Sequence, residues 1–304
     1  MRAARSRLRH ESWHLLHLCA YLGVGLALPH QLWTGQEFLS SPFAAALWWT
    51  LWAAAAGAVL VWRVGLPLLR SLRHDLRVAA VVPEADDVVS VYLTGRRLDR
   101  FPATAGRFCT FRLLAGAGWS RAHPYSLSAA PGPHELRITV KALGDGSRRV
   151  AALTPGTRVL VEGPYGRLTA RARSRSGVAL IGAGVGVTPL RALAEELDYA
   201  PGEAVLLQRA TGRPLFDAEF AHLVATRGLR VLVLPGPRRA PDSWIGEGAP
   251  VGVDDATLLR HWVPDIAERD VHVCGPETWS VAVLQSLHAA GVPDTGIHLE
   301  HFSW

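Results

Sequence analysis

The chain has 304 residues, of which 49% are hydrophobic and 19% charged, and this composition excludes a disordered or acidic-tail protein. A net charge of +6 would suit nucleic acid, but the arginines near the N-terminus flank apolar segments, which is typical of a membrane protein. Cys19, Cys109 and Cys274 lie far apart with no CxxC pair, so the sequence predicts no disulfide framework, structural zinc site or iron–sulfur cluster.

Two uncharged apolar segments, at about 13–32 and 43–62, open the chain. Each is long enough to cross a bilayer as a helix. The connector 33–42 has no lysine or arginine, whereas both outer flanks are arginine-rich. The positive-inside rule then predicts a membrane hairpin over 1–72, in the cell membrane, with both termini and the later domains in the cytosol. A signal peptide is the alternative for the first segment. It is disfavoured because no small-residue cleavage site follows and a second span comes at once.

After the hairpin, the sequence predicts two domains that differ in their pattern of apolar residues. Short β-branched runs at 88–93, 108–113, 136–142 and 157–162 lie between turn residues, which indicates an antiparallel Greek-key β-barrel over 73–172. Apolar runs at 178–181, 204–208, 229–234 and 271–274 alternate with helical stretches such as 189–197 and 280–290. This alternation predicts a doubly wound parallel sheet over 173–304.

A glycine-rich turn follows the first apolar run of the second domain. It reads Gly182-Ala-Gly-Val-Gly-Val-Thr-Pro189, with Thr188 placed to cap the next helix and Pro189 in its first turn. Gly182, Gly184 and Gly186 would let the backbone approach a pyrophosphate, whose charge a helix N-terminus favours. The context of strand, turn and helix favours a dinucleotide site over a merely tight connection.

Two further motifs fall in the predicted barrel. In His123-Pro124-Tyr125-Ser126, the tyrosine could pack on a flat heterocycle and the serine could donate a hydrogen bond. In Val140–Ser147, Lys141 is followed by a glycine turn with Gly146 and by Ser147, a plausible anion cradle. Lys141 is the single lysine among thirty-two basic residues, which suggests a specific need at that position.

Taken in order, these motifs resemble the ferredoxin–NADP reductase superfamily of flavoproteins, from about residue 75 to the last residue. The further motifs that match are Gly163-Pro-Tyr-Gly166, similar to the barrel-closing turn, Val273-Cys-Gly-Pro276, similar to the strand end beside the nicotinamide, and Leu299-Glu-His-Phe-Ser-Trp304, similar to the terminus that covers the flavin. The resemblance implies an FAD-binding barrel followed by an NAD(P)-binding domain, with direct hydride transfer from nicotinamide C4 to flavin N5.

The resemblance also implies roles for individual residues. The catalytic set would be Ser126 near flavin N5, Cys274 and Glu300 in the nicotinamide pocket, and Phe302 or Trp304 shielding the ring. The FAD-binding set would be His123, Pro124, Tyr125, Ser126, Lys141, Gly146, Ser147 and Trp304. The nucleotide-binding set would be Gly182, Gly184, Gly186, Thr188, Pro189, Arg209, Arg213, Gly275 and Pro276.

The choice of nucleotide rests on two arginines. Arg209 and Arg213 follow the second apolar run, and no acidic residue stands in the nearby turn. Arginine suits a 2′-phosphate, whereas a carboxylate would suit a free ribose hydroxyl. The sequence therefore favours NADPH over NADH.

His123 stands where the soluble reductases have arginine, and this form is similar to membrane ferric reductases and NADPH oxidases. By that resemblance, two haem-ligating histidines fall on His17 and His30. Segment 43–62 contains no histidine. Haem b would therefore need ligands from a partner subunit or from self-association of this chain.

The expected protein is a membrane-bound, FAD-dependent NAD(P)H oxidoreductase of ferric reductase type. It would move electrons from cytosolic NAD(P)H through FAD to a membrane haem or another one-electron acceptor. One alternative is a haem-free, membrane-anchored diaphorase that reduces a quinone, an iron–sulfur protein or a ferric chelate. A second alternative is a non-catalytic nucleotide-binding subunit that senses redox state.

Overall fold

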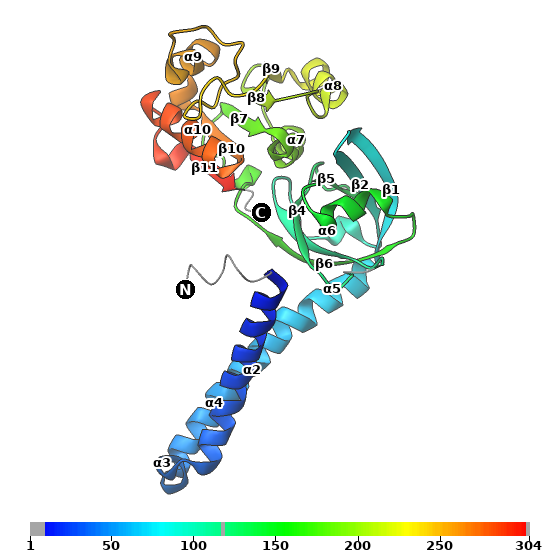
Figure 1. Ribbon diagram of the computed structural model, residues 1–304, viewed down its shortest axis with the longest axis vertical. Coiled ribbons are helices and arrows are strands. Elements are labelled where there is room, and N and C mark those ends of the chain that lie inside the picture. The colour runs from blue at the N-terminus through cyan, green and yellow to red at the C-terminus, as the bar shows by residue number, and fades with distance from the viewer. Residues whose placement is uncertain (1–9, 117–118, 302–304) are drawn as a thin grey trace. The chain divides into compact units, whose positions relative to one another are not determined.

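A computed structural model describes residues 10–116 and 119–301, without the side chains of 10–18, 37, 145 and 301 (Figure 1). Phe302 and Trp304 of the expected flavin-shielding tail lie outside the described residues. The chain divides into two compact units, residues 1–66 and 67–304.

The first unit is a pair of packed helices. Its elements are α2 (His10–Thr34), α3 (Gln36–Ser40), α4 (Pro42–Val59) and the π-helical turn η1 (Leu60–Gly65). Ser41 caps α4 by accepting a hydrogen bond from the amide of Ala44 at 3.4 Å, and a proline follows it at the first helical position. Trp52 Nε1 of α4 donates to the Gly25 carbonyl of α2 at 3.1 Å. Nothing lies within 4 Å of the place where a Gly25 Cβ would stand.

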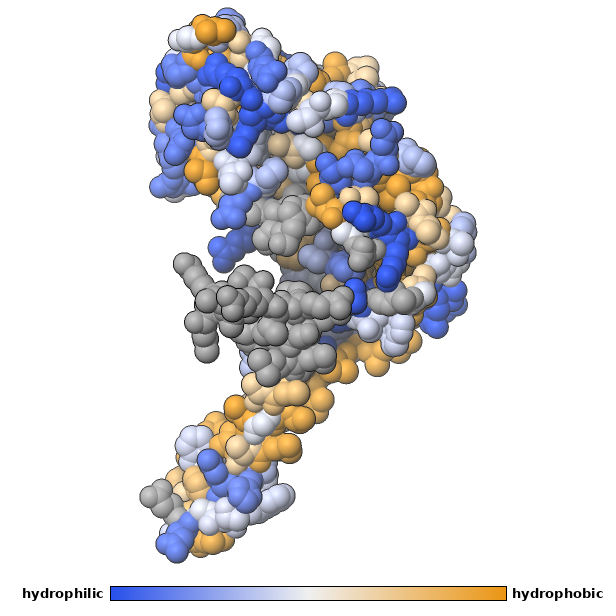
Figure 2. Space-filling view, in the orientation of Figure 1, coloured by the Kyte–Doolittle hydropathy of each residue, from blue (hydrophilic) through white to orange (hydrophobic). Residues whose placement is uncertain are grey.

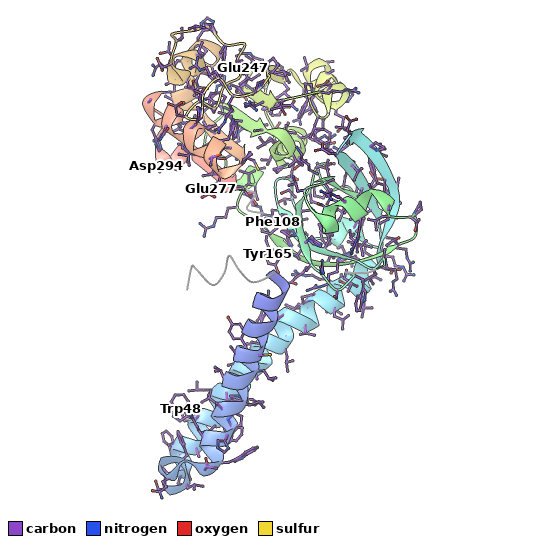
Figure 3. All side chains as sticks on the ribbon, viewed as in Figure 1. Trp48, Phe108, Tyr165, Glu247, Glu277 and Asp294 are labelled. Atoms are coloured by element: carbon purple, nitrogen blue, oxygen red, sulfur yellow. The ribbon has the colours of Figure 1, made fainter. Side chains whose placement is uncertain are left out.

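Large apolar side chains of this unit point outward, and hydrophobic colouring covers much of its visible surface in Figure 2. Trp48 of α4 is 45% exposed (Figure 3). Among the described residues, one helical stretch, Pro42–His74, is long and apolar enough to cross a membrane, and none of its apolar window is buried. It contains the span expected at 43–62. The span expected at 13–32 falls in α2. Within the described residues, α2 does not combine the length and the apolar character that a membrane-crossing helix needs.

The second unit begins in helix α5 (Leu66–His74), whose two faces differ. Ser71 is buried, and its Oγ accepts from the Val161 amide at 3.0 Å and donates to the Val161 carbonyl at 3.3 Å. His74 is also buried, whereas Leu68, Leu69 and Leu72 are at least half exposed. The end of the helix is thus fixed to a strand edge through its polar face.

An antiparallel six-stranded barrel follows. Its strands are β1 (Leu76–Ala85), β2 (Val88–Thr94), β3 (Phe108–Leu113), β4 (His123–Ser126), β5 (Glu135–Lys141) and β6 (Arg158–Tyr165), in the order β4-β3-β6-β1-β2-β5. A bridge between Leu127 and Ile138 links the two ends of the sheet. The short helices of this region are η2 (Leu98–Arg100), α6 (Asp145–Arg148), η3 (Arg149–Ala152) and η4 (Ala170–Ala172). Alternate strand residues such as Val91, Phe111 and Ile138 fill the interior.

The last part is a five-stranded parallel sheet. Its strands are β7 (Val178–Ala183), β8 (Ala204–Ala210), β9 (Arg230–Pro235), β10 (Asp270–Gly275) and β11 (Ile297–His301), in the order β11-β10-β7-β8-β9. Helices α7 (Val187–Glu196) and α8 (Asp217–Arg227) cover one face, and α9 (Asp255–Trp262) and α10 (Glu277–Ala289) cover the other (Figure 1). The short helices are η5 (Gly184–Gly186), η6 (Ile266–Glu268) and η7 (Asp294–Gly296).

The order of the parallel strands places the switch point between β7 and β10. Ligands of such sheets bind beyond the carboxyl ends of the strands at that point. The glycine turn after β7 and the Cys274-Gly275-Pro276 end of β10 both lie there. The antiparallel and parallel sheets expected from the sequence are confirmed, and the ends of the predicted strands differ from the observed ones by at most three residues.

Candidate cofactor sites

A cavity of about 260 Å³ opens at one end of the barrel. It is lined by Leu113, Ala115, Gly116, Arg121, His123, Gly146, Arg149, Val150, Ala152 and Leu153. The ionisable side chains in this lining are two arginines and a histidine, without a carboxylate. A cavity with this lining suits an anion.

Two motifs that are separate in the sequence meet at this cavity. A Cβ on Gly146 would lie 2.9 Å from His123 Cε1, so helix α6, which contains this glycine, packs directly on the imidazole. Burial, and then the charge of Arg121, lower the pKa of His123, so the ring is neutral at pH 7. The ring of Tyr125 stacks beside it, with centroids 6.2 Å apart and planes at 28°. Pro124, between them, is exposed.

The remaining expected FAD residues differ in their placement. Ser126 is buried, and its Oγ has no hydrogen-bond partner within the described part of the chain. Ser147 Oγ accepts hydrogen bonds from the amides of Leu143 and Gly144, each at 2.9 Å. This hydroxyl therefore stabilises the turn to which it belongs. Lys141 Nζ lies 3.4 Å from Asp87 Oδ2 and does not line the cavity. The expected anion-binding lysine is therefore an ion-pair partner at the strand end.

The residues present fit the diphosphate and flavin of FAD. Arg121 and Arg149 supply positive charge, and Gly146 leaves room beside His123. The unpartnered Ser126 hydroxyl is a buried donor of the kind that a ligand satisfies, because native proteins seldom leave such a group unpaired. The sequence did not single out the two arginines, since their contribution depends on how the loop before β4 and helix η3 converge.

The glycine turn after β7 is packed tightly against the end of β10. A Cβ on Gly186 would collide with the Cys274 carbonyl and lie 2.9 Å from Gly275 Cα. Thr188 and Pro189 lie buried in the first turn of α7, and Thr188 Oγ1 donates to the Val185 carbonyl at 2.8 Å instead of capping the helix.

Further glycines keep this strand end free of side chains. A Cβ on Gly182 would lie 2.8 Å from Leu190 Cδ1, and one on Gly275 would lie 2.6 Å from the Trp279 ring. Gly184 has φ +54°, a conformation that glycine adopts without strain. Pro276 stands at the N-cap of α10. The glycine turn and the Cys-Gly-Pro strand end are thus in close contact at one edge of the sheet.

Cys274 and Glu300 face each other across β10 and β11 as register partners. Burial, and then the charge of Glu300, raise the pKa of the Cys274 thiol well above its usual range. Burial raises the pKa of Glu300 to about 7, and its Oε2 has no hydrogen-bond partner.

The barrel turn expected at residues 163–166 reaches the same carboxylate. A Cβ on Gly166 would lie 3.2 Å from Glu300 Oε1 and 3.2 Å from the Phe108 ring. The Gly163–Pro164 peptide bond is cis. Phe108 and Tyr165 are neighbours, with ring centroids 5.7 Å apart (Figure 3). An aromatic pair and a carboxylate with one unpartnered oxygen therefore stand where the barrel meets the parallel sheet.

Basic side chains gather beyond β8 and β9. Arg209 is 7% exposed; one of its terminal nitrogens donates to the Gly236 carbonyl at 2.9 Å, and its Nε has no partner. Burial, and then the charge of Arg238, lower the pKa of Arg209. One terminal nitrogen of Arg238 is buried without a partner, and Arg213 is exposed. Arg238 was not expected from the sequence, because it belongs to the next strand connection.

The histidines expected to bind haem are not brought into a ligand set in the described part of the chain. His30 is exposed near the end of α2, and the side chain of His17 lies outside the described residues. No group of three or more histidine, cysteine or acidic side chains that could hold a metal occurs among the residues that the structure describes.

The barrel and its neighbours have known counterparts. Residues 73–169 match the family model of an FAD-binding domain. The ferredoxin–NADP⁺ reductase of Plasmodium falciparum superposes with a TM-score of 0.59 at 11% identity, covering 75% of this chain and 95% of that one. The fold is that of the ferredoxin–NADP reductases.

Two relatives extend this similarity. The ferredoxin reductase component of the Mycolicibacterium smegmatis 3-ketosteroid-9-alpha-monooxygenase is 29% identical over 75% of this chain and 65% of its own length. A Mycobacterium tuberculosis NADPH oxidoreductase is 27% identical over 97% of this chain and 70% of its own length. This chain spans 65% and 70% of the length of these two relatives, and in that part the similarities agree with the expected class, an FAD-dependent NAD(P)H oxidoreductase. They support the superfamily and not specifically its ferric reductase branch.

Proposed function

We propose that this chain is a flavin-dependent NAD(P)H reductase that delivers electrons to a partner protein of an oxygenase type. The observation that carries the proposal is the juxtaposition of two sites in one compact unit. A basic cavity is built by two separate flavin motifs, and a glycine turn is packed on the Cys274–Gly275 strand end. The partner class comes from the similarity to a monooxygenase reductase component.

The residues of the two sites suit the two cofactors that the proposed reaction requires. Bound FAD would accept a hydride from the nucleotide and release electrons singly. Arg121 and Arg149 would bind the diphosphate, and His123 would present a neutral edge beside it. The buried Ser126 hydroxyl would donate a hydrogen bond to the flavin ring. Glu300, with a pKa of about 7, would hold or release a proton beside Cys274 at neutral pH.

The nucleotide is proposed to be NADPH. Arg209 and Arg238 place two guanidinium groups near each other, and neither has a carboxylate partner among the described residues. Two adjacent cations without such a partner favour a bound dianion, and a 2′-phosphate is the group that distinguishes NADPH from NADH. The similarity to an NADPH oxidoreductase supports the same choice.

The membrane part of the proposal rests on the apolar stretch within Pro42–His74. We propose that it anchors the reductase to the bilayer with the flavin unit on the cytosolic side. Haem ligation by His17 and His30, as in the ferric reductases, is the second candidate. It would require histidines from another chain, because α4 carries none. The haem-free diaphorase is the alternative that needs no histidine ligand from another chain.

The deciding experiment is an absorption spectrum of the detergent-purified chain, oxidised and then reduced anaerobically with NADPH or with NADH. The proposal predicts a flavin band that NADPH bleaches faster than NADH. A Soret band that shifts on reduction would support the haem candidate. A bound flavin that neither nucleotide reduces would overturn the reductase proposal and favour the redox-sensing subunit.

The cavity is tested with a matched pair of arginines. Arg149→Ala removes a charge from the cavity lining, whereas Arg158→Ala removes an exposed arginine that pairs with Asp75. A hydrogen bond to a charged group contributes roughly 1.5–3 kcal/mol, so Arg149→Ala should weaken FAD binding about tenfold or more. Arg158→Ala should leave it unchanged. Equal FAD affinity in both variants would place the flavin elsewhere.

A further inference from the structure

Four charged side chains connect the barrel to the parallel sheet and take no part in the proposed chemistry. Arg137 comes from β5, Arg191 and Glu195 from α7, and Glu219 from α8. These four residues are called the inter-domain ion-pair network below. All of them belong to the second compact unit.

Arg137 is the buried centre of the network. Its side chain is 4% exposed, and two of its nitrogens bind the two carboxylate oxygens of Glu219 at 2.7 and 2.9 Å. The same guanidinium donates to Ser128 Oγ at 3.1 Å and to the Ser128 carbonyl at 2.7 Å. Burial opposes its charge, but the hydrogen bonds that Arg137 donates to Glu219 and Tyr92 outweigh that effect and raise the pKa of Arg137. Such a bidentate pair fixes both partners in direction as well as distance.

Helix α7 carries the second half of the network. Arg191 Nε lies 2.5 Å from Glu219 Oε2, as an ion pair whose N–H is not aligned along the contact, and Arg191 also pairs with Glu195. Glu195 Oε2 accepts the amide of Ala130 at 2.8 Å. One turn of α7 is therefore bonded to the barrel segment that includes Ser128 and Ala130.

The neighbouring residue on α7 adds an independent bond to the barrel. Glu196 Oε2 accepts the amide of Ala105 at 2.8 Å. The following glycine, Gly106, has φ +79°, and a Cβ there would lie 3.0 Å from Leu193 of α7. Side-chain hydrogen bonding and close backbone approach thus hold the same helix against the barrel.

The network joins two segments that end at the two cofactor sites. Ser128 is two residues beyond Ser126, the buried, unpartnered serine of the strand that also supplies His123 to the cavity. Arg191 is five residues beyond Gly186, so roughly 7 Å of rigid helix separates it from the glycine turn. Any movement at the network would be transmitted to the separation between the flavin serine and the nucleotide loop.

A strained residue supports the same interpretation. Phe216 is buried, with a φ of 63° at the start of α8, a conformation that non-glycine residues seldom adopt. Its ring lies 5.0 Å from the Arg137 guanidinium. The surroundings of Arg137 therefore hold α8 in place despite the local cost.

We propose that Glu219 is a positioning residue: by joining Arg137 of the barrel to Arg191 of α7, it sets the distance between the flavin and nicotinamide sites for hydride transfer. This proposal rests on the proposed function. A displacement of about 1 Å from a productive geometry can cost about 100-fold in rate, so a modest loosening would be measurable.

The test compares Glu219→Gln with Asp265→Asn in the detergent-purified full chain. Asp265 is a matched control because it pairs with the buried Arg269 at 2.8 Å, and both residues of that pair belong to the parallel-sheet domain. Anaerobic stopped-flow mixing with NADPH measures the limiting rate of flavin reduction and the nucleotide Kd. Glu219→Gln should lower the limiting rate about tenfold or more and change the Kd less than about threefold. It should also alter the primary isotope effect obtained with 4-deuterated NADPH.

Asp265→Asn should lower the Tm without changing the limiting rate or the isotope effect. If Glu219→Gln instead lowers only the Tm and FAD content, as a structural ion pair would, the positioning role is wrong. Should Glu219→Gln fold poorly, Arg191→Lys keeps the charge but loses the reach to Glu219, and the same rate loss is expected of it. Failure of the wild type to reduce its flavin would contradict the proposed function itself, so the two failures are distinguishable.

Discussion

At the scale of single residues, Glu300 is a buried carboxyl whose surroundings bring its pKa close to neutral pH. Burial beside Cys274 and Gly166 raises its folded-state pKa from 4.5 to about 7. A carboxyl with a raised folded pKa contributes stability that is fully present below pH 4.5 and is lost as pH rises through about 7. Between pH 5 and 8, the Tm of the wild type should therefore fall relative to that of Glu300→Gln.

Thermal denaturation of the two proteins without added nucleotide, in buffers across that range, measures this difference. A change of 1 kcal/mol shifts the Tm of a domain of this size by roughly 2–4 °C, which is readily resolved. Glu162→Gln is the control, because Glu162 belongs to the strand that leads into the same barrel turn, and its carboxylate accepts a hydrogen bond from the Tyr165 hydroxyl at 2.7 Å. Parallel Tm curves for wild type and Glu300→Gln would contradict the prediction.

How much of the site could be predicted from sequence is visible in individual residues. His123 and Gly146 were expected at one site because each belongs to a contiguous motif, and they are in contact. Lys141 was expected there too, but it pairs with Asp87. Arg149 was not expected. A motif identifies residues next to each other in the chain, whereas the direction of a side chain at a strand end depends on neighbours distant in sequence.

At the scale of elements, the turn after β7 contains two glycines that are needed for different reasons, one for its backbone conformation and one for lack of space. Gly184 has a positive φ with nothing within 4 Å of a Cβ, whereas Gly186 has an ordinary φ but no room for a Cβ against Cys274. Gly184→Ala should cost about 1–2 kcal/mol of backbone strain. Gly186→Ala should cost more, because the strand end or helix α7 must move.

Melting temperatures and NADPH affinities of the two alanine variants check this order. Gly186→Ala should show the lower Tm and the weaker nucleotide binding, since its displacement acts on the backbone of Cys274 and Gly275. The same Tm for both variants would mean that the turn relaxes freely and is not a rigid part of the site.

The elements also show where sequence patterns are informative. Strands β7, β8 and β10 are wholly buried, so their apolar runs were recognisable. Strand β11 reads Ile-His-Leu-Glu-His and is partly exposed, and β1 directly follows a helix, so neither stood out as an apolar run. Strand β11 lies at the edge of its sheet, and β1 follows a helix in the chain. A short stretch of sequence does not show either circumstance, so these two strands could not be predicted from it.

At the scale of the whole molecule, the boundary between the two compact units divides helix α5 from the apolar stretch before it. Residues 67–74 belong to the second unit, where Ser71 bonds both backbone groups of Val161 and Arg70 donates to the Gly163 carbonyl. These bonds stabilise the barrel edge next to the turn that contacts Glu300. The last two turns of the helix are therefore part of the flavin unit and not a linker.

Two truncations test this division together with the proposed membrane anchor. A chain that begins at residue 67 keeps Ser71 and lacks the exposed apolar residues 42–59 of α4, so it should remain in the supernatant after alkaline carbonate extraction, bind FAD and be reduced by NADPH. A chain that begins at residue 76 loses the bonds to Val161 and should have a lower Tm and less FAD. The full chain should stay with the membranes until detergent is added, because transferring a continuous apolar helix into water is costly. Release of the full chain by carbonate would contradict the anchor, and equal FAD content in the two truncations would contradict the role of α5.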